Sequence, residues 1–131
     1  MFSFKKVKYK HILNIHDLCI KGQKVTCIVG ESGSGKSTLL RLLNKLISCD
    51  SGEILYNGQP LDAINSVELR RKVVMLPQTP AVFPGTVRDN LLIGLKFADK
   101  PSVDDERLWQ VLKIVHLSKN LNDDSQLVIG D

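Results

Sequence analysis

Partial alternation of apolar and polar residues predicts that the first 29 residues are rich in β-strand. Lysines at positions 5, 6, 8 and 10 partly alternate with apolar residues, which is typical of a half-buried strand over 2–9 with one face in water. A second strand is expected over residues 12–20, and the continuous apolar run 25–29 predicts a third, buried one. Because Cys27 lies inside this run, we expect it to be a small core residue.

The spacing of apolar residues changes after this run. Apolar residues at 39, 42, 43 and 46 recur with a period near 3.6, which predicts a helix within residues 36–46. Residues 52–61 begin as a short strand and contain the pair Asn57-Gly58, which strongly favours the tight turn of a β-hairpin. These segments therefore predict a helix followed by a hairpin.

The next segment predicts a short helix and then a buried strand. Asn65 and Glu68 have the spacing of a capping box, so a helix is expected to begin there and to continue to about Arg71. Residues 73–76 form a continuous apolar run that Pro77 closes, which predicts the strand.

Two further helix starts of the capping-box kind follow, at residues 86–89 and 102–105. The second opens the clearest amphipathic helix of the chain. Its apolar side is expected to carry Leu108, Val111, Leu112 and Val115. Trp109 lies close to that side, and packing is its expected role rather than stacking on a base.

Composition is that of a soluble globular domain. The 131 residues are 43% hydrophobic and 24% charged, and no stretch reaches the roughly 18 consecutive apolar residues of a membrane-spanning helix. The basic N-terminus is not followed by the apolar segment of a signal peptide. No internal repeat or long linker divides the chain, so a single domain is expected.

The cysteines, histidines and lysines indicate no further functional site. Cys19, Cys27 and Cys49 are spaced like no metal or redox motif, and an odd number does not close a disulfide framework, so a reducing cytosol fits best. The three histidines are scattered, which argues against a metal site. The net charge of +4 is accompanied by no nucleic-acid-reading motif, so no nucleic-acid partner is expected.

The strongest chemical signal is the loop between the third predicted strand and the helix after it. It follows the pattern G-x-x-x-x-G-K-[ST], which is typical of a nucleotide-phosphate cradle. Its glycines leave space for backbone N–H groups to approach phosphate oxygens. The predicted ATP-binding residues of this loop are Gly30, Glu31, Ser32, Gly33, Ser34, Gly35, Lys36, Ser37 and Thr38.

Two side chains of the loop have distinct predicted roles. Lys36 would neutralise the β- and γ-phosphates, and the Ser37 hydroxyl would ligate Mg²⁺, for which Thr38 is one position late. The positive end of the following helix would face the anion. A Gly/Ser turn that happens to precede a helix is the alternative, but the strand before and the helix after favour the cradle.

The order of these pieces resembles the nucleotide-binding ATPase domains of ABC transporters. Residues 29–42 look like their Walker A segment, and residues 51–58 are similar to their hairpin after the first helix. Residues 76–78 together with 83–91 resemble their Q-loop and its exit. The resemblance implies an α/β P-loop NTPase fold with an N-terminal antiparallel β subdomain.

The resemblance covers essentially the whole chain, but only about the first half of such a domain. The implied organisation is a β-rich segment 1–29, the loop and helix 30–46, a hairpin 52–61, and the Q-loop strand with following helices 65–131.

By the same resemblance, two residues outside the loop contribute to the site. Tyr9 stands where the family usually places an aromatic residue that stacks on adenine, although a strand-end tyrosine at a wet edge is the alternative. Gln78 would contact Mg²⁺ and the attacking water and couple the site to a transmembrane transporter subunit. The other implied partner is a second nucleotide-binding domain in a head-to-tail dimer. The implied location is cytoplasmic, peripheral at the inner face of the cell membrane.

Several features of the family are missing from these residues. There is no Leu-Ser-Gly-Gly-Gln signature, no run of four apolar residues followed by Asp-Glu, and no later switch histidine. Residues 127–131 are the nearest candidate for the second feature, but Asp131 looks like the end of a cut. We therefore expect a truncated ABC-type ATPase that binds Mg-ATP with little turnover.

Two other hypotheses stay open. A different P-loop enzyme, such as a small kinase, would need lid arginines, and the arginines of this chain show no lid arrangement. A non-catalytic nucleotide-binding or interaction module is the other hypothesis. Its exposed sheet edge would lead to self-association or marginal stability.

Overall fold

A computed structural model describes residues 1–79 and 81–125 of the chain. The chain forms two compact units, Met1–Leu76 and Pro77–Asp131, and each is described by itself. The single domain expected from the sequence is therefore divided just before Pro77.

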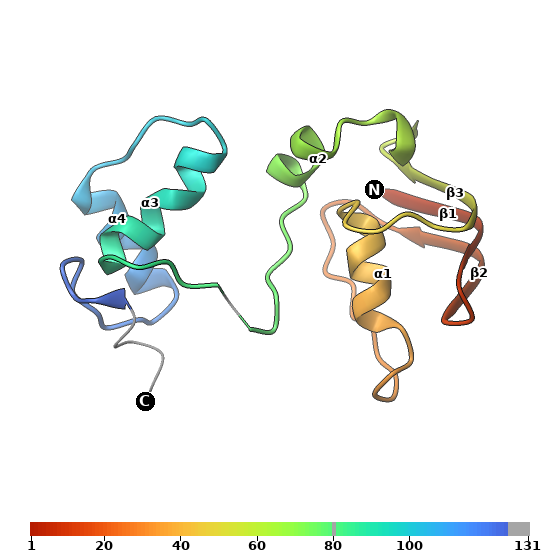
Figure 1. Cartoon of the computed structure of the whole chain (residues 1–131), viewed down its shortest axis with the longest axis horizontal. Helices are drawn as coiled ribbons and strands as arrows, with labels where there is room; N and C mark the ends of the chain where they lie inside the picture. Colours follow the sequence, from red (N-terminus) through yellow and green to blue (C-terminus); the bar gives the residue numbers. More distant parts are fainter. Residues whose placement is uncertain (80, 126–131) are drawn as a thin grey trace. The chain divides into compact units, whose positions relative to one another are not determined.

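The first unit is built on a four-stranded antiparallel sheet (Figure 1). Its strands, in the spatial order β2-β1-β3-β4, are β1 (Phe2–Tyr9), β2 (Leu13–Ile20), β3 (Ser51–Tyr56) and β4 (Gln59–Pro60). Between β3 and β4, Asn57 and Gly58 both have positive φ, of 51° and 84°, as a tight hairpin turn requires. The two N-terminal strands and the later hairpin are therefore confirmed.

A bulge interrupts β1 and changes which of its residues are buried. The pairing of β1 with β3 shifts register between Lys5 and Lys8, and Lys6 has a positive φ of 50°. Phe4 and Val7, three positions apart, are consequently both completely buried. The lysines of the strand are exposed, which confirms its predicted wet face.

Three helical segments accompany this sheet: α1 (Lys36–Leu43), a short 3-10 turn (Leu61–Ala63) and α2 (Ser66–Lys72). Helix α1 is shorter than the segment 36–46 predicted for it. Asn65 caps α2 by accepting hydrogen bonds from the backbone N–H groups of Val67 (2.9 Å) and Glu68 (3.2 Å), as expected. The core of the unit consists of Phe4, Val7, Leu39, Leu42, Ile54, Leu61 and Leu69, so α1 and α2 both pack with the sheet.

Two predicted strands are absent from the described residues. Residues 25–29 and 73–76 are not in any strand, and Val25 (101% exposed) and Val74 (83% exposed) lie open to solvent. Cys27 is exposed as well, so its prediction as a core residue is wrong. A continuous apolar run is typical of a strand covered on both faces in a parallel sheet, whereas the described sheet contains antiparallel pairs alone.

The second unit contains two helices, α3 (Val87–Phe97) and α4 (Asp105–Ile114). Helix α3 begins with the predicted capping box of Thr86 and Asp89. Helix α4 begins two residues later than the spacing at 102–105 suggested, because Asp104 is its N-cap and accepts a hydrogen bond from Arg107 N (2.9 Å).

The core of this unit is narrower than the apolar pattern predicted. It consists of Val87, Leu108, Leu112 and Leu121, with Leu91 and Leu92 packed against it. Val111 and Val115, expected on the buried side of α4, are 36% and 61% exposed. Trp109 is 44% exposed and is not part of this core. Over the described ranges, no helix is long and apolar enough to cross a membrane.

Candidate nucleotide-binding site

The glycine-rich loop lies directly before α1 and is held against the turn between β1 and β2. Gly35 is the buried N-cap of α1 and has a φ of 90°. A Cβ at this position would lie 2.7 Å from Leu13 Cδ2 and 3.1 Å from Ile12 Cγ2. Glycine is therefore required here both for the backbone conformation and for the space.

The start of α1 has the properties of an anion-binding site. Its N-cap forms no side-chain hydrogen bond, and its first turn contains no acidic residue. The first backbone hydrogen bond of the helix runs from Leu39 N to Gly35 O (2.8 Å), so the N–H groups of residues 36–38 lie ahead of the helical ladder. Together with the positive end of the helix dipole, these N–H groups favour a phosphate at this end.

Lys36 is folded back onto the loop. Its Nζ donates hydrogen bonds to the carbonyl oxygens of Gly30 (2.8 Å) and Glu31 (2.6 Å) and lies 3.5 Å from Ser34 Oγ. The loop is further closed by the hydrogen bond from Ser34 N to Glu31 O (3.2 Å). The ammonium group is therefore kept inside the loop, at the place where a phosphate charge would have to be neutralised.

The residues next to Lys36 fit a magnesium-bound nucleotide. Ser37 is exposed on the first turn of α1, and its hydroxyl is the hard oxygen donor that Mg²⁺ prefers. Thr38 is half-buried. Within the described ranges, no three His, Cys, Asp or Glu side chains gather as a metal site. At nucleotides Mg²⁺ usually takes several of its ligands from phosphate oxygens and water, so a cluster of acidic side chains is not required at this loop.

Tyr9 lies at the same end of the first unit as the loop. It ends β1 and pairs with Leu13, the residue that Gly35 approaches. The ring is half-buried against the core, and Lys10 Nζ lies 5.4 Å from its centroid. Tyr9 and Gly35 therefore share Leu13 as a neighbour, and stacking of Tyr9 on adenine stays a prediction.

Gln78 is not among the residues that the first unit brings together. It belongs to the second unit, directly follows Pro77, and is exposed outside any helix or strand. The strand that was predicted to lead into it, over residues 73–76, is not formed.

The segment after Gln78 is braced by two residues that the motif analysis missed. Asn90 accepts a hydrogen bond from Phe83 N (2.8 Å) and donates from Nδ2 to Phe83 O (2.9 Å) and Thr86 O (3.0 Å). The buried Ser125 donates from Oγ to Phe83 O (2.9 Å) and Gly85 O (2.8 Å). For Asn90, membership of the motif-like segment 83–91 was the available signal, whereas Ser125 had none.

Residues 127–131, the nearest candidate for an apolar run followed by Asp-Glu, lie outside the described residues.

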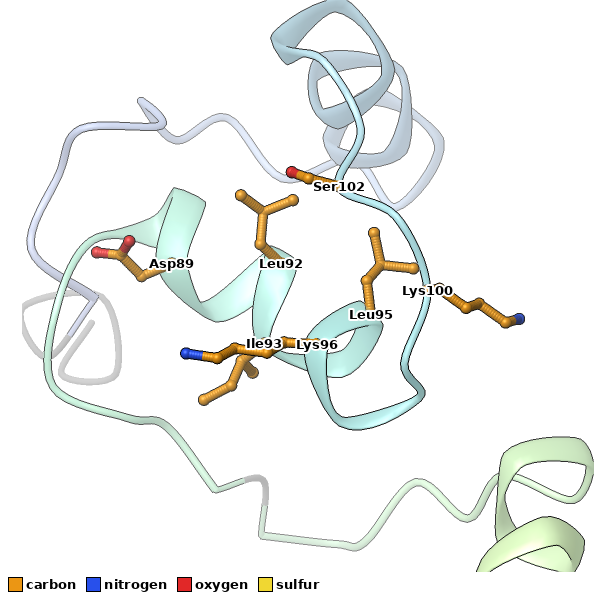
Figure 2. Close-up of a pocket in the computed structure, with 7 residues that line it drawn as sticks. All are labelled: Asp89, Leu92, Ile93, Leu95, Lys96, Lys100 and Ser102. Carbon is orange, nitrogen blue, oxygen red and sulfur yellow. The ribbon is translucent and has the colours of Figure 1, made fainter.

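The second unit also contains a cavity of about 410 Å³ along α3. Figure 2 shows Leu92 and Leu95 rising from α3 toward the stretch of chain that carries Lys100 and Ser102. Asp89 also lines it, but hydrogen bonds from the Thr86 backbone and side chain hold the pKa of this carboxyl below its usual value. Asp89 therefore takes part in the capping box that begins α3.

Comparisons with known proteins found a matching family model and similar proteins. A family model described as ABC transporter matches residues 13–129. A putative export ATP-binding/permease protein of Rickettsia typhi is 31% identical over 130 residues, which is 99% of this chain and 22% of that protein. Protein STAR1 of Oryza sativa subsp. japonica is 44% identical over 97 residues, which is 74% of this chain and 28% of that protein.

A third relative and a solved structure agree. The lactococcin-A transport/processing ATP-binding protein LcnC of Lactococcus lactis is 37% identical over 121 residues, covering 92% of this chain and 16% of LcnC. A bacterial Atm1-family ABC exporter with ATP bound has a similar fold, with a TM-score of 0.79 and 24% identity over 94% of this chain and 23% of the exporter chain.

The chain spans less than a third of the length of each of these relatives. The matches confirm the expected α/β P-loop fold with its N-terminal antiparallel β subdomain, and they rule out the small kinase considered from the loop. Because the family match extends over residues 13–129, the chain belongs to the ABC transporter family.

Proposed function

We propose that this chain binds Mg-ATP as the nucleotide-binding part of an ABC transporter. The observation that carries the proposal is the loop itself, in which Lys36 is held by the Gly30 and Glu31 carbonyls at the uncapped start of α1. Binding would exchange these contacts for phosphate oxygens, and a charged donor opposite a charged acceptor is the stronger hydrogen bond.

The residues of the loop would have different roles in nucleotide binding. The backbone N–H groups of residues 30–38 would surround the phosphates, and Lys36 would neutralise them. Ser37 would hold Mg²⁺, which supplies charge neutralisation at the β- and γ-phosphates when it is bound. Tyr9 would stack on the adenine ring, an interaction that requires an accessible aromatic face.

The proposed partners extend the role beyond nucleotide binding. In the transporter, Gln78 would contact Mg²⁺ and the attacking water and would link the site to a transmembrane subunit. A second nucleotide-binding domain would close over the nucleotide head-to-tail, at the cytoplasmic face of the membrane. The names of the relatives, an export ATP-binding/permease protein and a transport/processing ATP-binding protein, support a transport role.

We further propose that these 131 residues alone turn ATP over poorly. They contain no apolar run followed by Asp-Glu, so a carboxylate that orients the attacking water is not supplied. Positioning supplies most of the rate of phosphoryl transfer, and its loss lowers turnover more than affinity.

Equilibrium dialysis with Mg-ATP, paired with a phosphate-release assay on the same sample, tests both statements. We expect bound nucleotide with negligible phosphate release. Failure to retain any nucleotide would contradict the binding role, and release at the rate of an intact ATPase domain would contradict the proposed low turnover.

A further inference from the structure

Helices α1 and α2 are joined by two cationic side chains, each bound to the backbone near the other helix. Arg70 of α2 donates from Nε to Asn44 O (3.3 Å) and from Nη2 to Lys45 O (2.7 Å). Lys45, just beyond α1, donates from Nζ to Asp62 O (3.0 Å) and Ile64 O (2.8 Å), in the segment before α2. We call this reciprocal pair, Lys45 and Arg70, the clasp.

The clasp holds the residues just beyond the end of α1 that lies opposite the glycine-rich loop. Asn44 is the C-cap of α1 and Lys45 follows it, and the backbone N–H groups of residues 44–46 already donate to the last carbonyl groups of the helix. The negative end of the helix dipole lies here, so a cationic side chain is favourable at this position. A guanidinium group presents two donors in a fixed plane, so Arg70 suits a pair of neighbouring carbonyl oxygens. The helix whose N-terminus forms the cradle is therefore stabilised from its other end by a residue of α2.

Lys45 occupies its position in spite of an unfavourable backbone conformation. Its φ is 55°, in the left-handed region that usually favours glycine after a helix. For a non-glycine residue this conformation is strained, because Cβ approaches the following carbonyl oxygen. The two hydrogen bonds of its side chain give a physical reason for a lysine here.

The clasp also lies on the route along the chain to Gln78. Helix α2 ends at Lys72, and Val73 N still donates a hydrogen bond to Leu69 O (2.7 Å). The residues from there to Gln78 belong to no helix or strand. A change in the stability of α1 can therefore reach α2 through the hydrogen bonds of Arg70 and Lys45.

We propose that Arg70 and Lys45 are positioning residues that transmit nucleotide occupancy from α1 to α2 and the segment leading to Gln78. The inference rests on the proposed function, because it requires a nucleotide at the glycine-rich loop. A bound phosphate stabilises α1 at its N-terminus, and the clasp extends that stabilisation to α2.

Amide hydrogen exchange of the full chain, with and without Mg-ATP, tests the inference. In the unaltered protein, Mg-ATP should slow exchange several-fold in α1 and also in α2 and Val73. Arg70→Gln should keep the slowing in α1 and lose it in α2. Arg70→Lys, which keeps the charge without the two-pronged donor, should lie between. Lys72→Gln removes a positive charge from the same helix outside the clasp and should behave like the unaltered protein.

Each other outcome overturns a distinct statement. Slowing in α2 that survives Arg70→Gln, or that never occurs in the unaltered protein while α1 is protected, contradicts the clasp and leaves the nucleotide site intact. No slowing in α1 of the unaltered protein contradicts nucleotide binding, and the inference with it. Far-ultraviolet circular dichroism checks that each variant is folded. If Arg70→Gln is unfolded, full slowing of α2 in Arg70→Lys contradicts the clasp.

Discussion

Gly52 and Gly58 have nearly the same backbone conformation but very different surroundings. Their φ angles are 88° and 84°. A Cβ on Gly52 would lie 2.3 Å from Lys6 O and 2.6 Å from Val7 Cα, at the bulge of β1, whereas nothing lies within 4 Å of one on Gly58. Alanine at either position is strained, but at Gly52 it also forces two strands apart.

Substitution of these two glycines should therefore have unequal effects. Gly58→Ala should lower the free energy of unfolding by about 1 kcal/mol, the usual cost of a left-handed alanine. Gly52→Ala should cost roughly 3 kcal/mol or more, because β1 or β3 must move. Urea unfolding of both variants measures the difference, and equal losses would contradict the proposed contact between β3 and the bulge.

At the same residue scale, the glycine-rich loop could be predicted from the sequence, but the residues that pack against it could not. The spacing of glycine, lysine and serine predicts the loop from Gly30 to Ser37, because each residue type would have a chemical task at a phosphate. Ile12 and Leu13, which crowd Gly35, are ordinary apolar residues in the sequence. Their role depends on tertiary packing, which brings residues 12 and 13 against a glycine more than twenty positions along the chain.

Among the elements, the start of α3 depends on ionisation. The Asp89 carboxylate accepts hydrogen bonds from Thr86 N (2.8 Å) and Thr86 Oγ1 (2.7 Å), and these bonds lower the pKa of Asp89. A carboxyl whose pKa is lower in the folded state stabilises that state above its unfolded pKa, about 4 for aspartate. This stabilisation is lost as the pH falls through the lowered value.

Asp89→Asn should accordingly be less stable than the unaltered protein at pH 7, and the difference should shrink below about pH 4. Urea unfolding at pH 7 and pH 3 measures it. Asp99→Asn, which neutralises an exposed carboxylate after α3, serves as the matched control. A difference of the same size at both pH values would show that the charge of Asp89 does not stabilise the cap.

Local signals predicted most elements, and the errors share one cause. The hairpin at Asn57-Gly58 and the caps at Asn65 and Thr86 depend on neighbours within a few residues, and all three are present. Residues 25–29 and 73–76 are apolar enough for buried strands, but a strand also needs partner strands, which pattern alone does not provide. The bulge of β1 was missed for a similar reason.

At the scale of the whole molecule, the exposed apolar runs should promote self-association. Val25, Val29, Val74 and Leu76 are 101%, 86%, 83% and 86% exposed. We expect the chain to oligomerise with rising concentration or to be only marginally stable, since apolar segments without partners seek to pair. Sedimentation velocity over a concentration series measures this.

A charge placed in one run provides the comparison. Val74→Lys should reduce association, whereas Ile114→Lys, at a 70% exposed apolar residue of α4 outside both runs, should not. A monomer at all concentrations that unfolds in one cooperative transition would contradict the prediction.

Calorimetric titration with Mg-ATP tests the central claim, that the loop of residues 30–38 binds nucleotide. The unaltered chain should bind, and Lys36→Ala should weaken binding roughly 10- to 100-fold, since hydrogen bonds to charged groups contribute about 1.5–3 kcal/mol. Lys113→Ala, which removes a lysine from α4, should bind normally. Equal affinity in all three proteins, or no binding by the unaltered chain, would contradict the account.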